Sequence, residues 1–204
     1  MEKLMEEKIT SLSQLDPNGF YSYFDYLSWQ FEQRVELIKG KIFPMAAPNR
    51  RHQKASGYLS GRFFIFLEKS PCEYYAAPFD VRLYDNQKSI KKNQNFNTVV
   101  QPDVCIICDK DKLDDRGCKG APDLIVEILS PGNSKKEMDT KKRLYEENAV
   151  KEYWIINFDY EQVFQFVLND TGVYNPPIIL LTDAVLECAI FPELKINLEE
   201  LFAA

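Results

Sequence analysis

A short apolar run with a single acid near its centre constrains this chain more than any other feature. The run is Leu124-Ile125-Val126-Glu127-Ile128-Leu129. Apolar residues on both alternating faces are typical of a strand covered by helices on both sides, as in a mostly parallel sheet. An ionised carboxylate in such a strand costs several kcal/mol unless it is paired or holds a cation. Glu127 is therefore predicted to have a partner or a chemical role.

The length and charge of the chain bound its class. A chain of 204 residues suits one domain with a full core. The net charge of -6 argues against a protein that coats nucleic acid non-specifically, but it leaves room for a local basic surface. The N-terminus is acidic and polar, and no apolar run approaches the roughly 20 residues that a membrane span needs. We expect a cytoplasmic protein without a membrane segment.

Five cysteines include one C-x-x-C pair, Cys105 and Cys108. The pair falls in a strand-like run, where side chains three residues apart point to opposite faces. Because zinc needs its ligands on one side, the interpretation as a zinc site is the weaker one. We expect the cysteines to be small buried apolar residues in a reducing cytosol.

The pattern of apolar residues, turns and caps predicts an α/β protein with a mixed sheet around a strand-helix-strand unit. Helices are expected over residues 1–15, 20–33, 49–68 and 135–148. Strands are expected over residues 35–38, 41–43, 73–76, 80–84, 99–108, 123–129, 153–158 and 162–168, with loops over 85–97 and 109–120. We predict a single domain over residues 1–204, with an N-terminal helical region over 1–33 and a core over 34–204.

Two aspartates compete as the acidic neighbour of Glu127. Asp123 precedes it by four residues, which places it roughly 13 Å away along the strand, too far to share one metal ion. Asp103 stands at the start of another apolar strand, in Gln101-Pro102-Asp103. Two carboxylates from neighbouring strands can hold a hard divalent cation such as Mg²⁺, or Mn²⁺ in its place, with water in the remaining positions. Asp123 is interpreted as structural.

The helix after the Glu127 strand offers a lysine. Its inward face is defined by Met138, Leu144, Tyr145 and Ala149. Lys141 lies roughly 35° from the mean direction of that face and Lys142 roughly 65°. Lys141 is therefore favoured to point toward the strand, where a lysine can position water and stabilise charge that develops at phosphorus.

Several motifs together resemble one family. In order they are Val35-Glu36-Leu37-Ile38-x-Gly40, Arg51-His52-Gln53, Gln101-Pro102-Asp103-Val104, Gly120-Ala121-Pro122-Asp123-Leu124, Glu127-Ile128-Leu129-Ser130-Pro131, Lys141, Leu144-Tyr145 and Lys151-Glu152-Tyr153-Trp154-Ile155-Ile156. The chain resembles the Uma-two family within the PD-(D/E)xK restriction-endonuclease-like superfamily, from about residue 22 to the end.

The resemblance implies a restriction-endonuclease-like core with N-terminal helices and flanking β-hairpins. It also implies a metal-dependent phosphodiesterase site, with Asp103 and Glu127 as the acids of the motif. The superfamily's lysine normally stands two residues after the second acid, where this chain has Leu129. Lys141 would replace it from the helix, and Glu36 would be a further acid of the site.

His52, the only histidine, shares a helix face with Ala55, Leu59 and Phe63. One interpretation is a hydrogen-bonded histidine at the margin of the core. The other places it at the mouth of the acidic site, in contact with a phosphate or assisting proton transfer. Residues 48–67 contain four basic residues and no acid, which is typical either of a phosphate-facing helix or of a plain basic helix face.

The leading hypothesis is a Mg²⁺-dependent DNA endonuclease in which Asp103 and Glu127 bind metal, Lys141 orients water, and Glu36 and His52 support the site. A homodimer would suit an enzyme that cuts both strands. The alternative is a nuclease-fold module with weak or no catalysis that binds nucleic acid or a protein partner. A structural charge network around Glu127 is the third interpretation.

Overall fold

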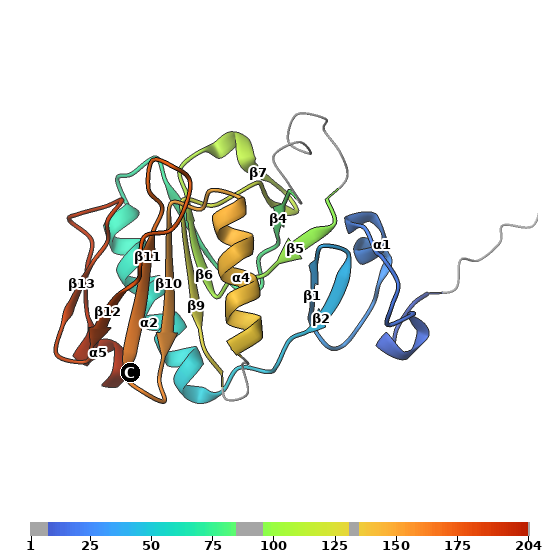
Figure 1. Ribbon diagram of the computed structural model, residues 1–204, viewed down its shortest axis with the longest axis horizontal. Helices are drawn as coiled ribbons and strands as arrows, with labels where there is room; N and C mark the ends of the chain where they lie inside the picture. The colour runs from blue at the N-terminus through green and yellow to red at the C-terminus, as the bar shows by residue number, and fades with distance from the viewer. Residues whose placement is uncertain (1–7, 85–95, 131–134, 204) are drawn as a thin grey trace, which may run out of the picture. The chain divides into compact units, whose positions relative to one another are not determined.

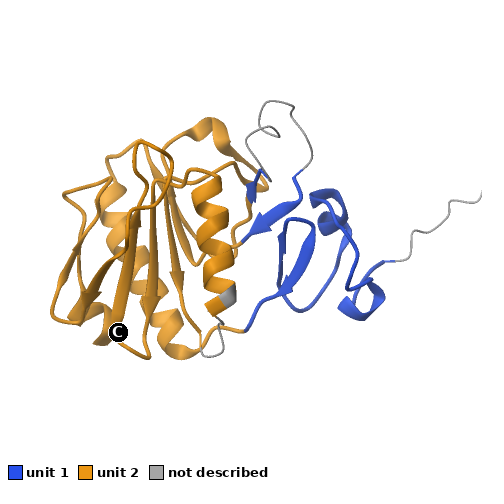
Figure 2. Cartoon of the chain, in the orientation of Figure 1, with its two compact units in different colours: residues 1–46, 82–100 blue, residues 47–81, 101–204 orange. Residues whose placement is uncertain are grey.

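The computed structural model describes residues 8–84, 96–130 and 135–203 (Figure 1). The chain divides into two compact units, shown in different colours in Figure 2. Unit 1 contains Met1–Ala46 and Arg82–Val100, and unit 2 contains Ala47–Val81 and Gln101–Ala204. The units therefore alternate along the sequence. In the described ranges, no helix is both long and apolar enough to cross a membrane.

Unit 1 is built around a small antiparallel sheet. β1 (Val35–Ile38) pairs with β2 (Lys41–Pro44) and with β5 (Thr98–Val100), which confirms the predicted hairpin. Lys39 and Gly40 form its turn with φ values of 49° and 76°, the left-handed conformation that a two-residue hairpin turn requires. The buried core of the sheet consists of Tyr23, Leu37 and Val99.

The N-terminal region is less helical than predicted. Its described residues form only a 3-10 turn, η1 (Leu12–Gln14), and a short helix, α1 (Tyr23–Ser28). The helix ends at Trp29, whose backbone is extended and whose ring packs against Tyr26 and Phe31. Aromatic packing thus overrides the helical pattern. Two predicted segments lie partly outside the described residues, namely residues 1–7 of the first helix and 85–95 of the loop.

Unit 2 contains a six-stranded sheet in the order β12-β11-β10-β9-β6-β3. Its strands are β3 (Glu73–Ala76), β6 (Val104–Ile107), β9 (Leu124–Ile128), β10 (Glu152–Asn157), β11 (Gln162–Val167) and β12 (Ile178–Leu181). β9 and β10 are parallel, whereas the other neighbours are antiparallel. The mixed sheet confirms the predicted fold class, and the expectation of a mostly parallel sheet is wrong. A strand between two helix layers is apolar on both faces whatever the direction of its neighbours.

Two helices cover opposite faces of this sheet (Figure 1). α2 (Arg50–Leu67) packs its buried residues against Val126 and the rest of the core on one face. α4 (Lys135–Glu147) lies on the other face, where the ring of Tyr145 is 4.9 Å from that of Tyr153. Both helices agree with the sequence prediction. β9 is thus apolar on both sides because each side meets a helix.

The predicted strand over residues 99–108 is two strands. β5 ends at Val100 in unit 1, and β6 begins at Val104 in unit 2. Pro102 lies in the interruption and has no backbone N–H to give to a ladder. The break places Asp103 directly before β6.

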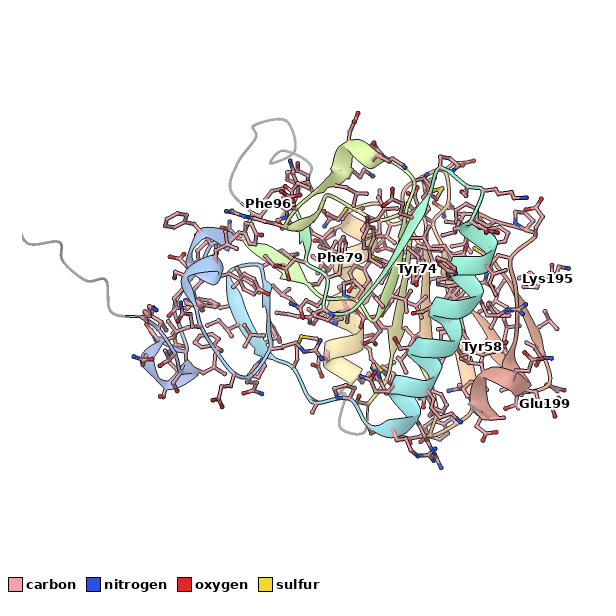
Figure 3. The ribbon with its side chains drawn as sticks, turned by 180° about the vertical axis from the view of Figure 1, so that it is seen from behind. Tyr58, Tyr74, Phe79, Phe96, Lys195 and Glu199 are labelled. Atoms are coloured by element: carbon pink, nitrogen blue, oxygen red, sulfur yellow. A yellow bond between two sulfur atoms is a disulfide. The ribbon has the colours of Figure 1, made fainter. Side chains whose placement is uncertain are left out.

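The remaining elements are short. They are β4 (Val81–Leu83), η2 (Lys110–Lys112), β7 (Leu113–Asp114), β8 (Gly117–Lys119), β13 (Val185–Glu187), β14 (Lys195–Asn197) and α5 (Leu198–Ala203). The predicted loop over residues 109–120 therefore contains a 3-10 turn and a hairpin of β7 with β8. Figure 3 shows α5 beside α2, where the Tyr58 hydroxyl donates to Glu200 Oε2 at 2.8 Å. Burial and that carboxylate raise the pKa of Tyr58 to about 12.

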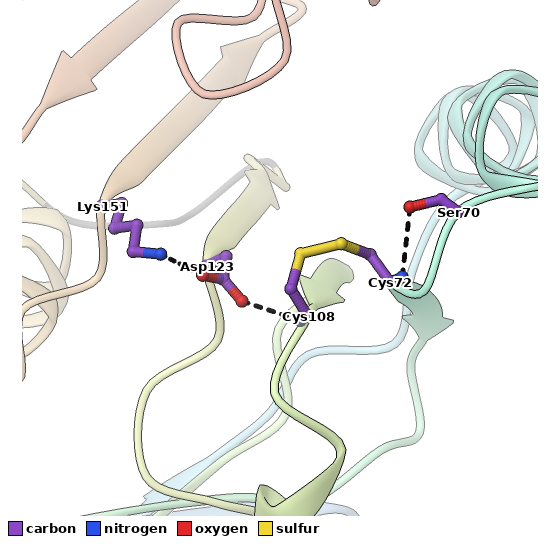
Figure 4. Close-up of a disulfide and its surroundings, with 5 residues drawn as sticks. All are labelled: Ser70, Cys72, Cys108, Asp123 and Lys151. Carbon is purple, nitrogen blue, oxygen red and sulfur yellow. Dashed lines mark hydrogen bonds and ion pairs between the residues drawn. A yellow bond between two sulfur atoms is a disulfide. The ribbon is translucent and has the colours of Figure 1, made fainter.

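A disulfide joins Cys72 and Cys108 (Figure 4), which corrects the expectation that these cysteines are reduced. β3 and β6 pair with Glu73 opposite Ile107, so the next position sets the two cysteines opposite each other. Sequence spacing does not reveal this pairing. Cys105, Cys118 and Cys188 form no disulfide and are buried, as expected for small apolar residues.

Glu152 anchors the C-terminal segment from inside the sheet. It is fully buried, and its Oε1 accepts hydrogen bonds from Trp154 Nε1 at 2.6 Å and Gln165 Nε2 at 2.7 Å. Its Oε2 accepts from Cys188 Sγ at 3.2 Å and from the Ile190 N–H at 3.0 Å. Burial, followed by the Glu152 carboxylate, raises the pKa of the Cys188 thiol and keeps it a donor. Four donors thus compensate one buried charge.

We expect reduction of the disulfide to lower the free energy of unfolding by about 4 kcal/mol, because the bridge closes a loop with a sequence separation of 36 residues. Urea denaturation with and without reductant measures the change. The double variant Cys72→Ser/Cys108→Ser is the control and should not respond to reductant. An unchanged midpoint for the reduced wild type would contradict the expectation.

Glu152→Gln should lower the free energy of unfolding by about 3 kcal/mol. The substitution replaces one acceptor oxygen by an NH2 group, which would face the N–H or S–H donors that this oxygen accepts from. Glu187→Gln is the matched control: its side chain is 61% exposed in a surface pair with Lys195, so it should change stability by less than about 1 kcal/mol. Chemical denaturation compares the two. Equal losses would show that the buried network does not carry the effect.

Candidate active site

The register between β6 and β9 brings the two predicted acids to the same place. Val104 lies opposite Val126, and Cys105 lies opposite Ile125. Continuing this register by one position sets Asp103 against Glu127. Each residue is only 9% exposed. The sequence prediction that Asp103, on a strand next to that of Glu127, is its acidic neighbour thus agrees with the sheet topology.

Asp103 is held by one backbone donor and one side-chain donor. Its Oδ2 accepts from the Ile128 N–H at 2.7 Å, and its Oδ1 lies 3.1 Å from His52 Nε2. His52 reaches it from the first turn of α2, where its own N–H donates to Asn49 Oδ1 at 2.9 Å. His52 is also buried on the face of α2 that meets the core. His52 therefore lies at the core margin and beside the acid, and its contact with a phosphate stays a prediction.

Glu127 is held from the opposite helix. Its Oε1 accepts from Lys141 Nζ at 2.9 Å and from the Tyr145 hydroxyl at 2.6 Å, both on α4. Lys142 instead places its ammonium 5.2 Å from the ring centroid of Phe166. Lys141, the lysine favoured by helical geometry, is therefore the one that reaches the carboxylate.

Tyr145 is the site residue that sequence reasoning did not assign. It stands four residues after Lys141, and residues at that spacing lie on one helix face. Since Tyr145 was already placed on the inward face, its distance from Lys141 could have identified it as a second donor to Glu127.

Two further residues were assigned from the sequence, Glu36 to the site and Asp123 to a structural role. Glu36 is buried on β1 and belongs to unit 1, whereas the two carboxylates and their partners belong to unit 2. Asp123 is structural, as predicted: its Oδ2 accepts from the Cys108 N–H at 2.8 Å, and its Oδ1 pairs with Lys151 Nζ at 2.6 Å.

Cys105 shares a face of the sheet with Glu127, because it pairs with Ile125, two residues before Glu127 on β9. Its side chain is fully buried. Burial raises the pKa of its thiol well above the usual range, and Cys118 and the Glu127 carboxylate add to the effect. Cys105 is therefore a neutral thiol, neither a ligand nor a nucleophile at neutral pH.

The carboxylates of Asp103 and Glu127 are the type of ligand that a hard divalent cation binds. Oxygen ligands are what Mg²⁺ and Mn²⁺ prefer, and Mg²⁺ usually keeps several waters beside one or two carboxylates. Among the described residues no group of three or more His, Cys, Asp or Glu side chains could hold a metal. Asp103 and Glu127 are the two residues that could hold such an ion, with water completing its shell.

The chain was compared with known families and structures. A family model described as "Putative restriction endonuclease", Uma2, matches residues 24–199, which is most of the chain. The chain belongs to the Uma2 family. The resemblance found in the motifs is thereby confirmed.

The chain is also similar to two other proteins. The "Uncharacterized protein slr1290" of Synechocystis is 26% identical over 151 residues, which covers 72% of this chain and 74% of that protein. A crystal structure described as a putative nuclease belonging to DUF820, from Anabaena variabilis, superposes with a TM-score of 0.71. It is 17% identical and the match covers 90% of this chain and 98% of that one, so it shows a shared fold.

Lys141→Met should lower the free energy of unfolding by about 3 kcal/mol, because it leaves the buried Glu127 carboxylate without its ammonium. Lys142→Met, the neighbouring lysine, should cost less than about 1 kcal/mol. Urea denaturation in the absence of divalent cations measures both.

A double variant, Glu127→Gln/Lys141→Met, should recover most of that loss because no buried charge remains to be compensated. If the double variant were as unstable as the sum of the single variants, the ion pair would not explain the effect.

Proposed function

We propose that this Uma2 protein is a metal-dependent phosphodiester hydrolase, and more narrowly a DNA endonuclease. The observation that supports this most is the arrangement of two buried carboxylates, Glu127 on β9 and Asp103 directly before the neighbouring β6, with donors from two different helices. One buried acid with its own hydrogen-bond donors is enough for a structural role. Two buried acids opposite each other are typical of a site that binds a cation.

Asp103 and Glu127 would hold Mg²⁺ or Mn²⁺. The chemistry that such an ion supplies is Lewis-acid stabilisation of the charge that develops on the phosphate oxygens during in-line attack by water. The chain's own contribution is positioning. The Ile128 N–H and His52 fix the carboxylate of Asp103, and Tyr145 fixes that of Glu127.

Lys141 and His52 would act on the substrate side of the site. The Lys141 ammonium, held at Glu127, can orient a water and stabilise developing charge on the phosphate. His52 lies beside Asp103, where an imidazole can contact a phosphate oxygen or transfer a proton. Glu36, in the other unit, stays a predicted supporting acid.

The basic residues of α2 support a nucleic-acid substrate. Arg50, Arg51 and Lys54 are exposed on this helix, whereas the guanidinium of Arg62 donates to the Lys195 carbonyl. Guanidinium and ammonium groups bind phosphate oxygens, so an exposed row of them beside an acidic site suits a phosphate backbone. DNA is the substrate that the restriction-endonuclease family description favours.

The test is cleavage of plasmid and oligonucleotide DNA with Mg²⁺ or Mn²⁺. We expect Glu127→Gln and Asp103→Asn each to lower the rate by at least about 100-fold, because each removes a charge from the metal site. Asp123→Asn is the matched control, because Asp123 is a buried acid that pairs with Lys151 and not with a residue of the site. The folded fraction of this variant should retain the activity.

Binding of Mn²⁺, measured by paramagnetic resonance, gives a readout that is independent of turnover. Wild-type protein should bind the ion and Glu127→Gln should bind it much more weakly. If the protein cut neither DNA nor RNA and Glu127→Gln left Mn²⁺ binding unchanged, the proposal would fail. Salt-sensitive DNA binding that survived both substitutions without turnover would favour the non-cleaving module.

A further inference from the structure

A cavity of about 300 Å³ lies at the carboxyl ends of β9 and β10. Its lining residues are Asn49, Arg50, Arg51, Leu129, Phe158 and Asp159. We propose that this cavity binds one unpaired nucleotide of the substrate, so that the protein acts on single strands or frayed ends. The inference rests on the proposed function and specifies the form of its substrate.

The cavity is formed where two parallel strands end. Leu129 directly follows β9, and Phe158 directly follows β10. The Leu129 N–H donates to the Ile156 carbonyl at 2.9 Å, which keeps the two strand ends together. Crevices at the carboxyl ends of parallel strands are the common place for ligands in α/β sheets.

The same segments lead directly to the proposed active site. Arg51 precedes His52, whose Nε2 lies 3.1 Å from Asp103 Oδ1. Leu129 follows Ile128, whose N–H donates to Asp103 Oδ2 at 2.7 Å. A nucleotide in the cavity would therefore be a neighbour of a phosphodiester bound at Asp103.

The lining offers an apolar wall, guanidinium groups and a carboxylate, which are the three kinds of surface that a nucleotide needs. Leu129 and Phe158 are half-buried and apolar, and a base can stack on such a wall. The Phe158 ring also contacts that of Phe202, with ring centroids 5.3 Å apart in an edge arrangement.

Charge in the lining distinguishes a nucleotide from a bare anion. The guanidinium groups of Arg50 and Arg51 are exposed and suit a phosphate. Asp159 places a carboxylate in the same lining, which repels a small anion but accepts hydrogen bonds from the N–H groups of a base edge.

The size of the cavity favours an unpaired base. Its volume lies at the lower end of the range for small-molecule sites, which suits one nucleotide and not a base pair. A base inside a duplex is stacked on both faces and paired at its edge, so it reaches such a cavity only if the strand is single, frayed or opened.

The test measures binding of a fluorescein-labelled single strand and of the same strand in a blunt duplex, without divalent cation, by anisotropy. Wild-type protein should prefer the single strand. Phe158→Leu should weaken single-strand binding about tenfold and leave duplex binding unchanged, because it keeps apolar volume but loses the ring. Phe158→Tyr should retain the affinity.

Arg51→Ala should weaken single-strand binding several-fold and reduce its salt dependence by about one counterion. Arg62→Ala is the matched control, since Arg62 lies on the same helix but donates to the Lys195 carbonyl at 3.3 Å. It should change single-strand affinity less than twofold.

Equal affinity for single strand and duplex, or losses for Phe158→Leu and Arg51→Ala no larger than that for Arg62→Ala, would overturn the inference. That outcome leaves the proposed hydrolase intact if Mg²⁺-dependent cleavage still requires Asp103 and Glu127. Conversely, if the protein cut no nucleic acid but bound single strands in a way that depended on Phe158, the proposed hydrolase activity would be refuted and the nucleotide site supported.

Discussion

The antiparallel pairing of β6 with β9 is the contact on which the rest of the site depends. A slip by one residue would turn Glu127 from the α4 side of the sheet to the α2 side. Both ends of this short ladder are closed by an aspartate. Asp103, directly before β6, accepts from the backbone at the end of β9, and Asp123, directly before β9, accepts from the backbone after β6. The register is therefore fixed by the same residue type at each end.

The two helices supply hydrogen-bond donors to the buried carboxylates from opposite faces of this sheet. Glu127 projects from an apolar strand and receives its ammonium and hydroxyl from α4. Asp103 turns toward the strand end and receives an imidazole from α2. Because each acid has its own donors, neither depends on a metal ion to be compensated when the protein folds. A charge network around Glu127 is present in this folded state, and the third sequence interpretation, that this network is purely structural, stays a rival to the proposed chemistry.

The sequence predicted the parts of the site that depend on local periodicity. The apolar run around Glu127, the helix of His52 and the inward direction of Lys141 all follow from patterns within one element. The parts that depend on pairing between distant segments did not follow. The interruption before β6 joins its two halves to different sheets, and the partner of Cys108 is set by the register with β3. Neither leaves a pattern within its own segment.

The lysine shows how the fold accommodates Leu129. A lysine two residues after Glu127 would stand on the same face of a regular strand, because side chains alternate. α4 covers that face, and Lys141 reaches Glu127 from it, so the ammonium arrives on the side where a strand lysine would have been. Position 129 therefore does not need a charged side chain. Leu129 lines the cavity with Phe158, and a lysine there would bring an ammonium to a surface suited to a base. Moving the lysine to the helix therefore separates charge stabilisation at the carboxylates from apolar contact beside them.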